Sequence, residues 1–326
     1  MLRRAGTAAV LVLALAACER NFGTPVDPST LGYHPCVAAG DCVSTEGDGA
    51  DLREDPGPSV DTELPPGLAG PFQGRWAMIE TQAVTTVDMP FVGVLETTSV
   101  HHYLVDIVAD GDALVMHQRL CELEIFEQTC HNIGITVIPP AYVDAITSFE
   151  RRVLLESGDA GAAFVSERVT RLRGAKLGDP ESDPMPTLAD PTGAFDQDGD
   201  GYPGMTVLLN GVFAGSSVYT AQRWWTELQG SILTADYVDG PILHANETNT
   251  LGADPPALAY QTQNAPHEDP TRSFFRMVRV PEDHTCADVI EAAYGDDPCP
   301  GNGQPITDCP MRGFDHLDGV PIVCGD

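Results

Sequence analysis

The chain has 326 residues and a formal net charge of -31, with 48 acidic side chains against 17 basic ones. Binding to nucleic acid depends on Lys and Arg neutralising phosphates, so this balance excludes nucleic acid as a partner. An excess of carboxylates suits divalent cations, although a large net charge also serves solubility alone.

The N-terminus has the pattern of an export signal. Arg3 and Arg4 precede an apolar run over residues 8–17, which is too short to span a bilayer. The residues Leu15, Ala16, Ala17 and Cys18 that follow resemble the lipobox of bacterial lipoproteins. An ordinary secretory signal with an incidental cysteine is the alternative.

The resemblance implies that residues 1–17 are removed and that Cys18 becomes the lipidated first residue of the mature chain. It further implies an exported protein anchored by lipid to the outer membrane, facing the periplasm or the cell surface, with the inner membrane as the alternative. Residues 18–70 are rich in Pro, Gly, Asp and Glu and predict a tether. A β domain over residues 71–281 and a Cys-rich tail over residues 282–326 complete the predicted organisation.

Eight cysteines remain after Cys18, an even number that favours disulfides in an exported protein. Zinc is the competing use, but the sequence contains no CxxC pair. Spacing along the chain favours two local pairs and leaves three pairings open for the last four cysteines. The local pairs are Cys36 with Cys42 and Cys121 with Cys130, and the last four are Cys286, Cys299, Cys309 and Cys324.

Strand patterns begin at Phe72, where β-branched and aromatic residues replace the polar tether. Asp110 and Gly111, flanked by alternating sequence, predict a two-residue hairpin turn that pairs Val108 with Ala113. One face of this hairpin is apolar enough to form a core wall. That face carries Tyr103, Val105, Ile107, Leu114, Met116 and Leu120.

A short helix is expected over residues 141–151, after two prolines, and another near residues 287–294 in the tail. Further strands are expected at 163–172, 205–209, 216–228, 231–238, 241–245 and 273–280, with glycines such as Gly230, Gly240 and Gly252 in the turns between them.

Roughly ten strands with short turns predict a single all-β domain, an antiparallel meander barrel or a sandwich. Gly74 and Trp76 form a Gly-x-Trp motif that resembles the opening of lipocalin-type barrels. A tryptophan that plugs the end of another β core is the alternative.

Residues 196–201 read Asp-x-Asp-x-Asp-Gly, the first half of an EF-hand calcium loop. The predicted metal ligands are Asp196, Asp198, Asp200 and the carbonyl of Tyr202, within a loop over residues 196–207. The second half departs from the EF-hand, because Val207 stands where the bidentate glutamate belongs.

The loop therefore resembles the Asp-rich calcium loops of thrombospondin type 3 repeats and of many exported bacterial proteins. That resemblance implies calcium in a structural role, with waters or a remote acid such as Asp190 completing the shell. A solvated acidic turn that binds no metal is the alternative.

Two histidines and two tryptophans have other interpretations. The hairpin register places His102 and His117 on one face with Asp106, a combination that can bind zinc, but the absence of a third ligand favours two ordinary histidines. Trp224 and Trp225 are adjacent on one strand, so one is expected to face the core and the other solvent.

The sequence contains no Gly-x-Ser-x-Gly, His-Glu-x-x-His or Walker motif, and no catalytic residue is predicted. Taken whole, the chain resembles cell-surface lipoproteins of Gram-negative bacteria whose activity is unknown. The resemblance implies a calcium-stabilised β domain on a membrane that binds a surface protein, a glycan or a small apolar ligand. An exported hydrolase with an acidic site is the alternative.

Overall fold

The computed structural model describes residues 69–89, 93–110, 113–128, 135–155 and 157–294. The predicted export signal, the tether and most of the Cys-rich tail lie outside these residues, as do Cys18, Cys36, Cys42, Cys130, Cys299, Cys309 and Cys324. None of the helices in the described part of the chain has the length and hydropathy that a membrane span requires.

The described chain is built mainly from twelve antiparallel strands. The strands are β1 (Gly74–Met89), β2 (Gly93–Asp110), β3 (Ala113–Gln128), β4 (Ile135–Val137), β5 (Phe149–Leu155), β6 (Ala163–Ser166), β7 (Val169–Arg173), β8 (Met205–Asn210), β9 (Ser216–Thr234), β10 (Tyr237–Asp254), β11 (Gln263–Pro266) and β12 (Phe274–Arg279). The helices are α2 (Ala69–Phe72), α3 (Pro140–Asp144) and α4 (Cys286–Tyr294), with 3-10 turns η2 (Gly211–Phe213), η3 (Pro256–Leu258) and η4 (Pro270–Arg272).

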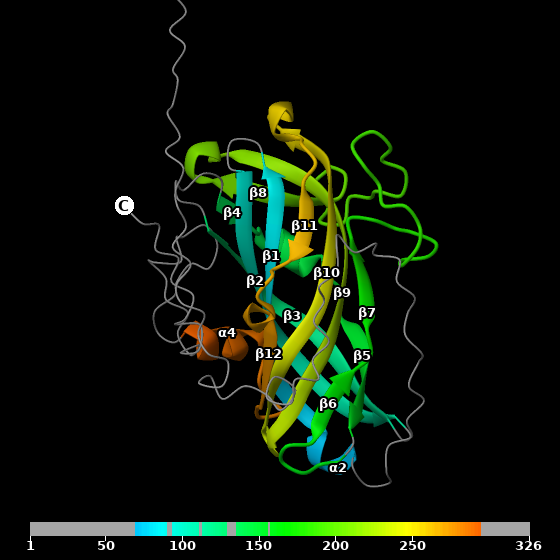
Figure 1. The fold of residues 1–326 in the computed structure, drawn as a ribbon, viewed down its shortest axis with the longest axis vertical. Helices are drawn as coiled ribbons and strands as arrows, with labels where there is room; N and C mark the ends of the chain where they lie inside the picture. Colours follow the sequence, from blue (N-terminus) through cyan, green and yellow to red (C-terminus); the bar gives the residue numbers. More distant parts are fainter. Residues whose placement is uncertain (1–68, 90–92, 111–112, 129–134, 156, 295–326) are drawn as a thin grey trace, which may run out of the picture.

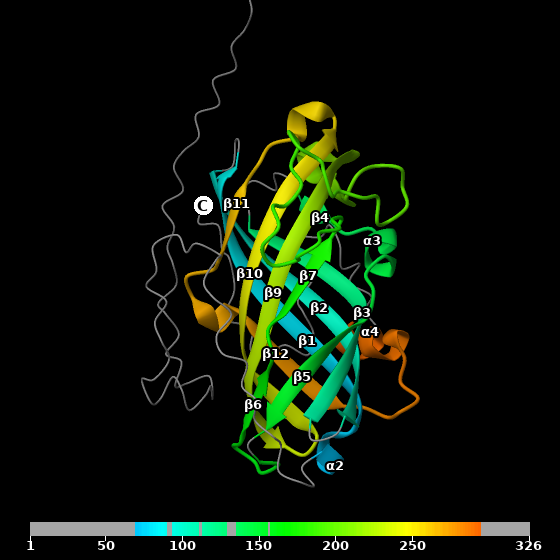
Figure 2. The ribbon, with the colours of Figure 1, turned by 90° about the vertical axis from the view of Figure 1, so that its right-hand side faces the viewer.

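Eight of these strands form a closed barrel (Figures 1 and 2). They pair around the ring in the order β1, β2, β3, β5, β6, β9, β10, β12, and β12 pairs again with β1. Neighbours in the ring follow one another along the chain, so the barrel is a meander. The prediction of an all-β antiparallel barrel is confirmed, and closure of the ring decides against the sandwich.

The four remaining strands extend one end of the barrel. β7 and β8 both pair with β9, β4 pairs with β8, and β11 pairs with β1. In Figure 1, β4, β8 and β11 lie towards the end opposite α2. The two ends of the barrel therefore differ in construction.

The half of the barrel next to α2 is filled by apolar side chains. Trp76 is fully buried there, and its Nε1 donates a hydrogen bond to the carbonyl of Phe72 at 3.1 Å. Burial of this apolar surface supplies the main driving force for folding. The motif Gly74-x-Trp76 thus places a tryptophan at the packed end of the barrel. The same core cluster includes Met78, Val105, Ile107, Leu114, Met116, Phe164, Leu228, Phe275 and Met277.

The predicted hairpin is present with a different register. Val108 pairs with Val115 rather than with Ala113, so the expected pairing is wrong by two residues. Side chains alternate between faces with a period of two, so this shift leaves every residue on its predicted face. The six residues of the predicted core wall are all buried, with exposed fractions of 7% or less.

Residues 141–151 do not form one helix, contrary to the prediction. The helix α3 ends at Asp144, and Phe149 begins β5. β5 alternates between inward and outward residues, so Arg151 enters the barrel while Glu150 and Arg152 face solvent. The sequence places charges on both faces of this strand, which hides the alternation. The helix expected near residues 287–294 is confirmed as α4.

Gly230, Gly240 and Gly252 lie inside β9 and β10 rather than in turns. A Cβ on Gly230 would lie 2.4 Å from the Phe275 ring, and one on Gly240 would lie 2.4 Å from the Cα of Gly230. The two glycines therefore allow β9 and β10 to approach each other beneath the Phe275 ring. As a result, β9 continues as a strand through Gly230, where a turn was expected, and ends at Thr234.

The expected pairing of Cys121 with Cys130 is wrong, because Cys121 is bonded to Cys286. The expected pairing of Cys286 within the last four cysteines is wrong for the same reason. Cys121 is the extra residue at a bulge in β3, between Leu120, which pairs with Tyr103, and Glu122, which pairs with His102. β3 stays extended to Gln128, about 23 Å farther along at the usual rise per residue, so no local loop closes on Cys121. The bond fixes α4 to the outside of β2 and β3 (Figure 1).

Candidate ligand cavity

The end of the barrel opposite α2 contains a cavity of about 240 Å³ that is partly open to solvent. Its walls come from β1, β2, β3, β9 and β10 of the ring and from β4, β7, β8, β11, α3 and η3 outside the ring. The polar residues that line it include Gln82, Thr86, Thr97, Ser99, Thr136, Thr220, Gln222, Asn246, Thr248, Thr250, Thr262 and Asn264. Apolar lining residues such as Val84, Leu95, Ile125 and Val207 lie between them.

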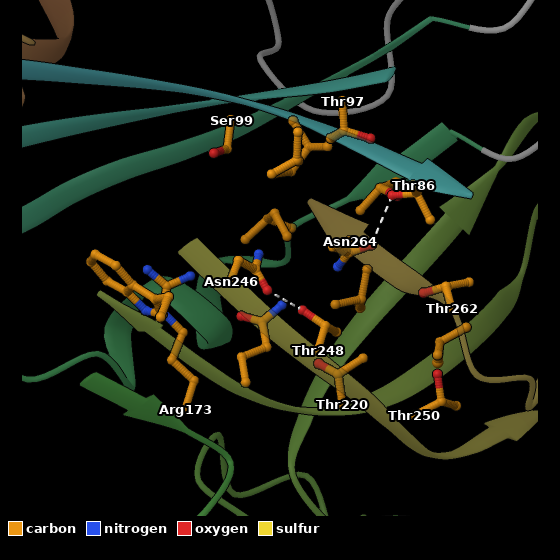
Figure 3. A pocket seen from close by; sticks show the side chains of 18 of the residues that line it. Thr86, Thr97, Ser99, Arg173, Thr220, Asn246, Thr248, Thr250, Thr262 and Asn264 are labelled. Carbon is orange, nitrogen blue, oxygen red and sulfur yellow. Dashed lines mark hydrogen bonds between the residues drawn. The ribbon is translucent and has the colours of Figure 1, made fainter. Parts of the chain in front are cut away.

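The lining is nearly free of charge. Among the described residues that line it there is no Asp, Glu or Lys, although the chain carries 48 acidic residues, and Arg173 is the one formally charged side chain. Figure 3 shows Arg173 at one side of the cavity, with threonine and asparagine side chains along the opposite strands. This distribution differs sharply from the acidic surface, so the cavity offers hydrogen bonds without repelling anions.

Two hydrogen bonds orient the asparagines of the wall (Figure 3). Thr86 Oγ1 donates to Asn264 Oδ1 at 2.8 Å, and Thr248 Oγ1 donates to Asn246 Oδ1 at 2.6 Å. Since each amide oxygen accepts a hydroxyl hydrogen, each amide nitrogen is left to donate. The wall therefore provides neutral donors at fixed positions.

Arg173 is held at the inner end of the cavity by aromatic rings. It is 5% exposed, and its guanidinium carbon lies 4.8 Å from the ring centre of Trp224 and 5.8 Å from that of Tyr142. Its Nη1 donates to the Tyr142 hydroxyl at 3.4 Å, and its Nη2 lies 3.5 Å from His101 Nε2. Both contacts are long for hydrogen bonds, and Nε has no hydrogen-bond partner within the described part of the chain.

Among the described residues, no carboxylate forms an ion pair with Arg173. A buried charge is normally paired, because removing it from water without compensation is unfavourable. Arg173 is therefore a cation whose partners within the protein are neutral.

His101 lies beside Arg173 at the inner end of the cavity, which we call its floor, and the imidazole ring is neutral. It is 3% exposed, and burial, followed by the positive charge of Arg173, lowers its pKa well below the usual value of 6.5. Its ring is stacked on Tyr103 with centres 6.0 Å apart. Because Nε2 faces the Arg173 donor, Nδ1 carries the proton, and a hydrogen bond with the backbone of Glu80 partly opposes the fall in the pKa of His101.

A buried polar layer separates the cavity from the apolar half of the barrel. Arg151 and Glu80 are both fully buried, with Arg151 Nη2 at 3.5 Å from Glu80 Oε1. The Arg151 guanidinium also donates to Gln118 Oε1 at 2.9 Å, Ser166 Oγ at 3.2 Å and Thr226 Oγ1 at 2.6 Å. Burial raises the pKa of Glu80 above 4.5 even though Arg151 opposes this shift.

A cluster formed by Glu96, His267 and Arg272, which we call the clasp, holds β11 against the open end of the barrel. Glu96 on β2 accepts a hydrogen bond from Arg272 Nη1 at 3.0 Å and lies 3.7 Å from His267 Nε2. Hydrogen bonds with His267 and Arg272 lower the pKa of Glu96 to about 2. Since β11 contributes Asn264 to the wall, this clasp helps to fix the shape of the cavity.

Asp196, Asp198 and Asp200 form a cluster in which one oxygen from each lies within 4.8 Å of the others, close enough to hold one metal ion. Backbone amides of Gly199 and Gly201 donate to Asp196 and curl the loop. The predicted three carboxylates are therefore together. Burial, followed by the charges of Asp200 and Asp196, raises the pKa of Asp198. In the described chain, Asp190 is not part of this cluster, so the remote ligand suggested by sequence is not found there.

The aspartate loop is joined to the barrel beside Arg173. Gln197, between the first two aspartates, accepts a hydrogen bond from the Gly174 amide at 2.8 Å and donates one to the Ala145 carbonyl at 3.0 Å. Gly174 packs so closely that an added Cβ would lie 2.7 Å from the Cα of Gly204. The aspartate loop therefore packs against the backbone of Gly174, the residue that follows Arg173 in the chain.

The structure separates the histidines that sequence placed together. His102 pairs with Glu122 across the hairpin, while His117 pairs with Asp106, four residues along β2. His102 Nε2 lies 3.3 Å from Glu124, and His117 Nδ1 lies 3.2 Å from Glu150. No cluster containing them could hold a metal ion among the described residues.

Trp224 and Trp225 divide as predicted, with Trp224 buried at the cavity and Trp225 half-buried on the other face. Arg168 stacks on the Trp225 ring at 3.9 Å, whereas Arg171 and Arg173 lie over the Trp224 ring. Sequence reasoning missed Arg173 and His101 as site residues. Arg171 and Arg173, which share one face of β7, were the available signal, but their spacing does not reveal that this face turns inward.

Comparisons with models of known protein families, with curated proteins and with solved structures found no match. The chemistry of the cavity and of the aspartate cluster therefore carries the functional argument.

Proposed function

We propose that this chain is an exported, lipid-anchored binding protein that holds a small amphipathic molecule in its barrel. The cavity carries the proposal, because a concave site with apolar walls and a few convergent polar groups is the usual form of a small-molecule site. Lipidation at Cys18 and attachment to the outer membrane complete it, and both follow from the resemblance of the N-terminus to lipoprotein signals.

The cavity favours binding over hydrolysis. A hydrolase with an acidic site needs two or three convergent carboxylates, and the residues that line the cavity in the described chain include none. Glu80 lies beneath the floor and contacts Arg151. The site is thus equipped with hydrogen-bond donors and apolar surface.

Filling the cavity tests the proposal. The probe is N-phenyl-1-naphthylamine, a neutral amphipathic molecule whose fluorescence rises in apolar surroundings. Thr97 lines the cavity, while its neighbour Thr98 faces the other side of β2. We expect Thr97→Trp to weaken probe binding by about tenfold or more, since the indole occupies the space of the ligand, a loss of about 1.4 kcal/mol.

Thr98→Trp is the matched control and should leave the affinity unchanged. Equal binding by the two variants, or no saturable binding by the native chain, would contradict the proposal.

We further propose that Asp196, Asp198, Asp200 and the Tyr202 carbonyl bind calcium in a structural role. Support comes from the aspartate cluster and from Oδ1 of Asp198, which is buried without a hydrogen-bond partner. Calcium would neutralise the three carboxylates and fix the loop that contacts Gly174 through Gln197.

Calcium is expected to stabilise a form of the protein that begins at residue 19 and therefore lacks Cys18. With a dissociation constant of about 0.1 mM, about 2 mM calcium should add about 2 kcal/mol to the free energy of unfolding and raise Tm by about 4–8 °C. Asp198→Asn should abolish this rise, while Asp190→Asn, outside the cluster, should preserve it. A melting curve that chelator leaves unchanged would show that the loop is only an acidic turn.

A further inference from the structure

We infer that the cavity is selective for ligands bearing a carboxylate, which Arg173 receives at the inner end. This inference rests on the proposed function and names the chemical class of its ligand. The observation behind it is a buried guanidinium that lines the cavity and pairs with no carboxylate among the described residues.

The protein gives Arg173 little compensation for its burial. Its two nitrogen contacts, at 3.4 and 3.5 Å, are long and go to the neutral Tyr142 and His101, and Nε contacts no acceptor. The Trp224 ring supplies a cation–π contact, which stabilises a cation without neutralising it. A guanidinium presents a fork of donors that matches the two oxygens of a carboxylate.

Trp224, which lies beside Arg173 at the floor of the cavity, also favours a ligand that accepts hydrogen bonds. Trp224 is 4% exposed and lines the cavity, and its Nε1 has no hydrogen-bond partner. Arg173 and Trp224 thus both have donors in excess of the acceptors that the described residues supply, as expected of a site that receives an acceptor-only group.

The charge of the site favours a carboxylate over a phosphate. Arg173 is the one formal charge among the described lining residues and balances one negative charge, whereas a dianionic phosphate usually requires several cations. The threonine and asparagine walls, interspersed with valine and leucine, suit a short aliphatic or hydroxylated body. The ligand class is therefore a small amphipathic monocarboxylate.

The test uses the native chain with four probes of equal length: octanoate, 1-octanol, octylamine and octyl phosphate. Binding is measured by calorimetry and by displacement of N-phenyl-1-naphthylamine. We expect octanoate to bind about ten- to a hundredfold more tightly than 1-octanol, as for a hydrogen-bonded charge pair. Octylamine should bind least, and octyl phosphate should bind less tightly than octanoate.

Arginine variants assign this selectivity to one side chain. Arg173→Gln should remove the preference for octanoate over 1-octanol, and Arg173→Lys should keep part of it, because the charge remains without the fork. Arg168→Gln is the matched control, since Arg168 stacks on Trp225 outside the cavity. Circular dichroism and Tm confirm that each variant is folded.

The outcomes separate the two proposals. Failure of the native chain to bind N-phenyl-1-naphthylamine and all four octyl probes overturns the proposed function and this inference with it. Binding of that probe together with equal affinities for octanoate and 1-octanol leaves the proposed function standing and overturns the inference, because Arg173 is then a structural cation held by its rings. Tighter binding of octyl phosphate than of octanoate overturns the choice of carboxylate.

Discussion

Replacing Arg151 with methionine is expected to lower the free energy of unfolding by about 3–5 kcal/mol, the range found when one partner of a buried ion pair is removed. The Arg151 side chain is fully buried and contacts Glu80, Gln118, Ser166 and Thr226. Methionine preserves much of the volume but leaves these buried polar groups without their donor. Urea unfolding measures the loss.

Arg152→Met is the matched control, because the adjacent Arg152 pairs with Glu167 at the surface, where both side chains are about half exposed. Its effect should stay below about 1 kcal/mol. Arg151→Met combined with Glu80→Met should recover part of the loss, since the pair is then replaced by apolar groups. If Arg151→Met is as mild as Arg152→Met, the buried layer does not hold the barrel together.

The loss in Arg151→Met should also grow with pH. Arg151 opposes the rise in the pKa of Glu80, so removing it raises that pKa further above 4.5. A carboxyl with a raised pKa in the folded state favours folding at low pH, and this contribution is lost as pH rises from its unfolded value towards the folded one. The variant should therefore fall further behind the native chain at about pH 8 than at about pH 5.

Removing the disulfide with Cys121→Ala and Cys286→Ala is expected to lower the free energy of unfolding by about 2–5 kcal/mol. The bond joins residues 165 apart in sequence, so it strongly restricts the unfolded chain. It also fixes α4 to the outside of the barrel, where Val289 is buried. Guanidinium unfolding under non-reducing conditions measures the effect.

Cys36→Ala with Cys42→Ala is the control, because that predicted pair would close a short loop in the tether, and it should leave the barrel's stability nearly unchanged. Peptide mapping under non-reducing conditions provides a direct check. A peptide linking Cys121 to Cys130 would contradict the structure.

The sequence was sufficient to predict the fold class and one wall of the core. Alternation at the first hairpin assigned Tyr103, Val105 and Ile107 to the interior even though the turn was misplaced, because a shift of two residues preserves the faces. Closure of the barrel needed long-range pairing between β12 and β1, which no local pattern contains.

The candidate site was much harder to predict. Inward threonines such as Thr97 and Thr248 have the same pattern as a solvent-facing strand, because the cavity that they line is itself polar. Arg151 has the appearance of a helix terminus when read locally, and Arg173 is one of several alternating arginines. Their burial depends on contacts with distant strands. The aspartate cluster was predictable because its three carboxylates are close in sequence.

The two ends of the barrel have different relations to the rest of the chain. Ala69 and Phe72 enter at the packed end through α2, and the cavity lies at the other end (Figure 1). The proposed lipid on Cys18 would therefore connect the bilayer to the end of the barrel that lies away from the cavity. The proposed ligand could then enter and leave from the aqueous space while the protein stays anchored.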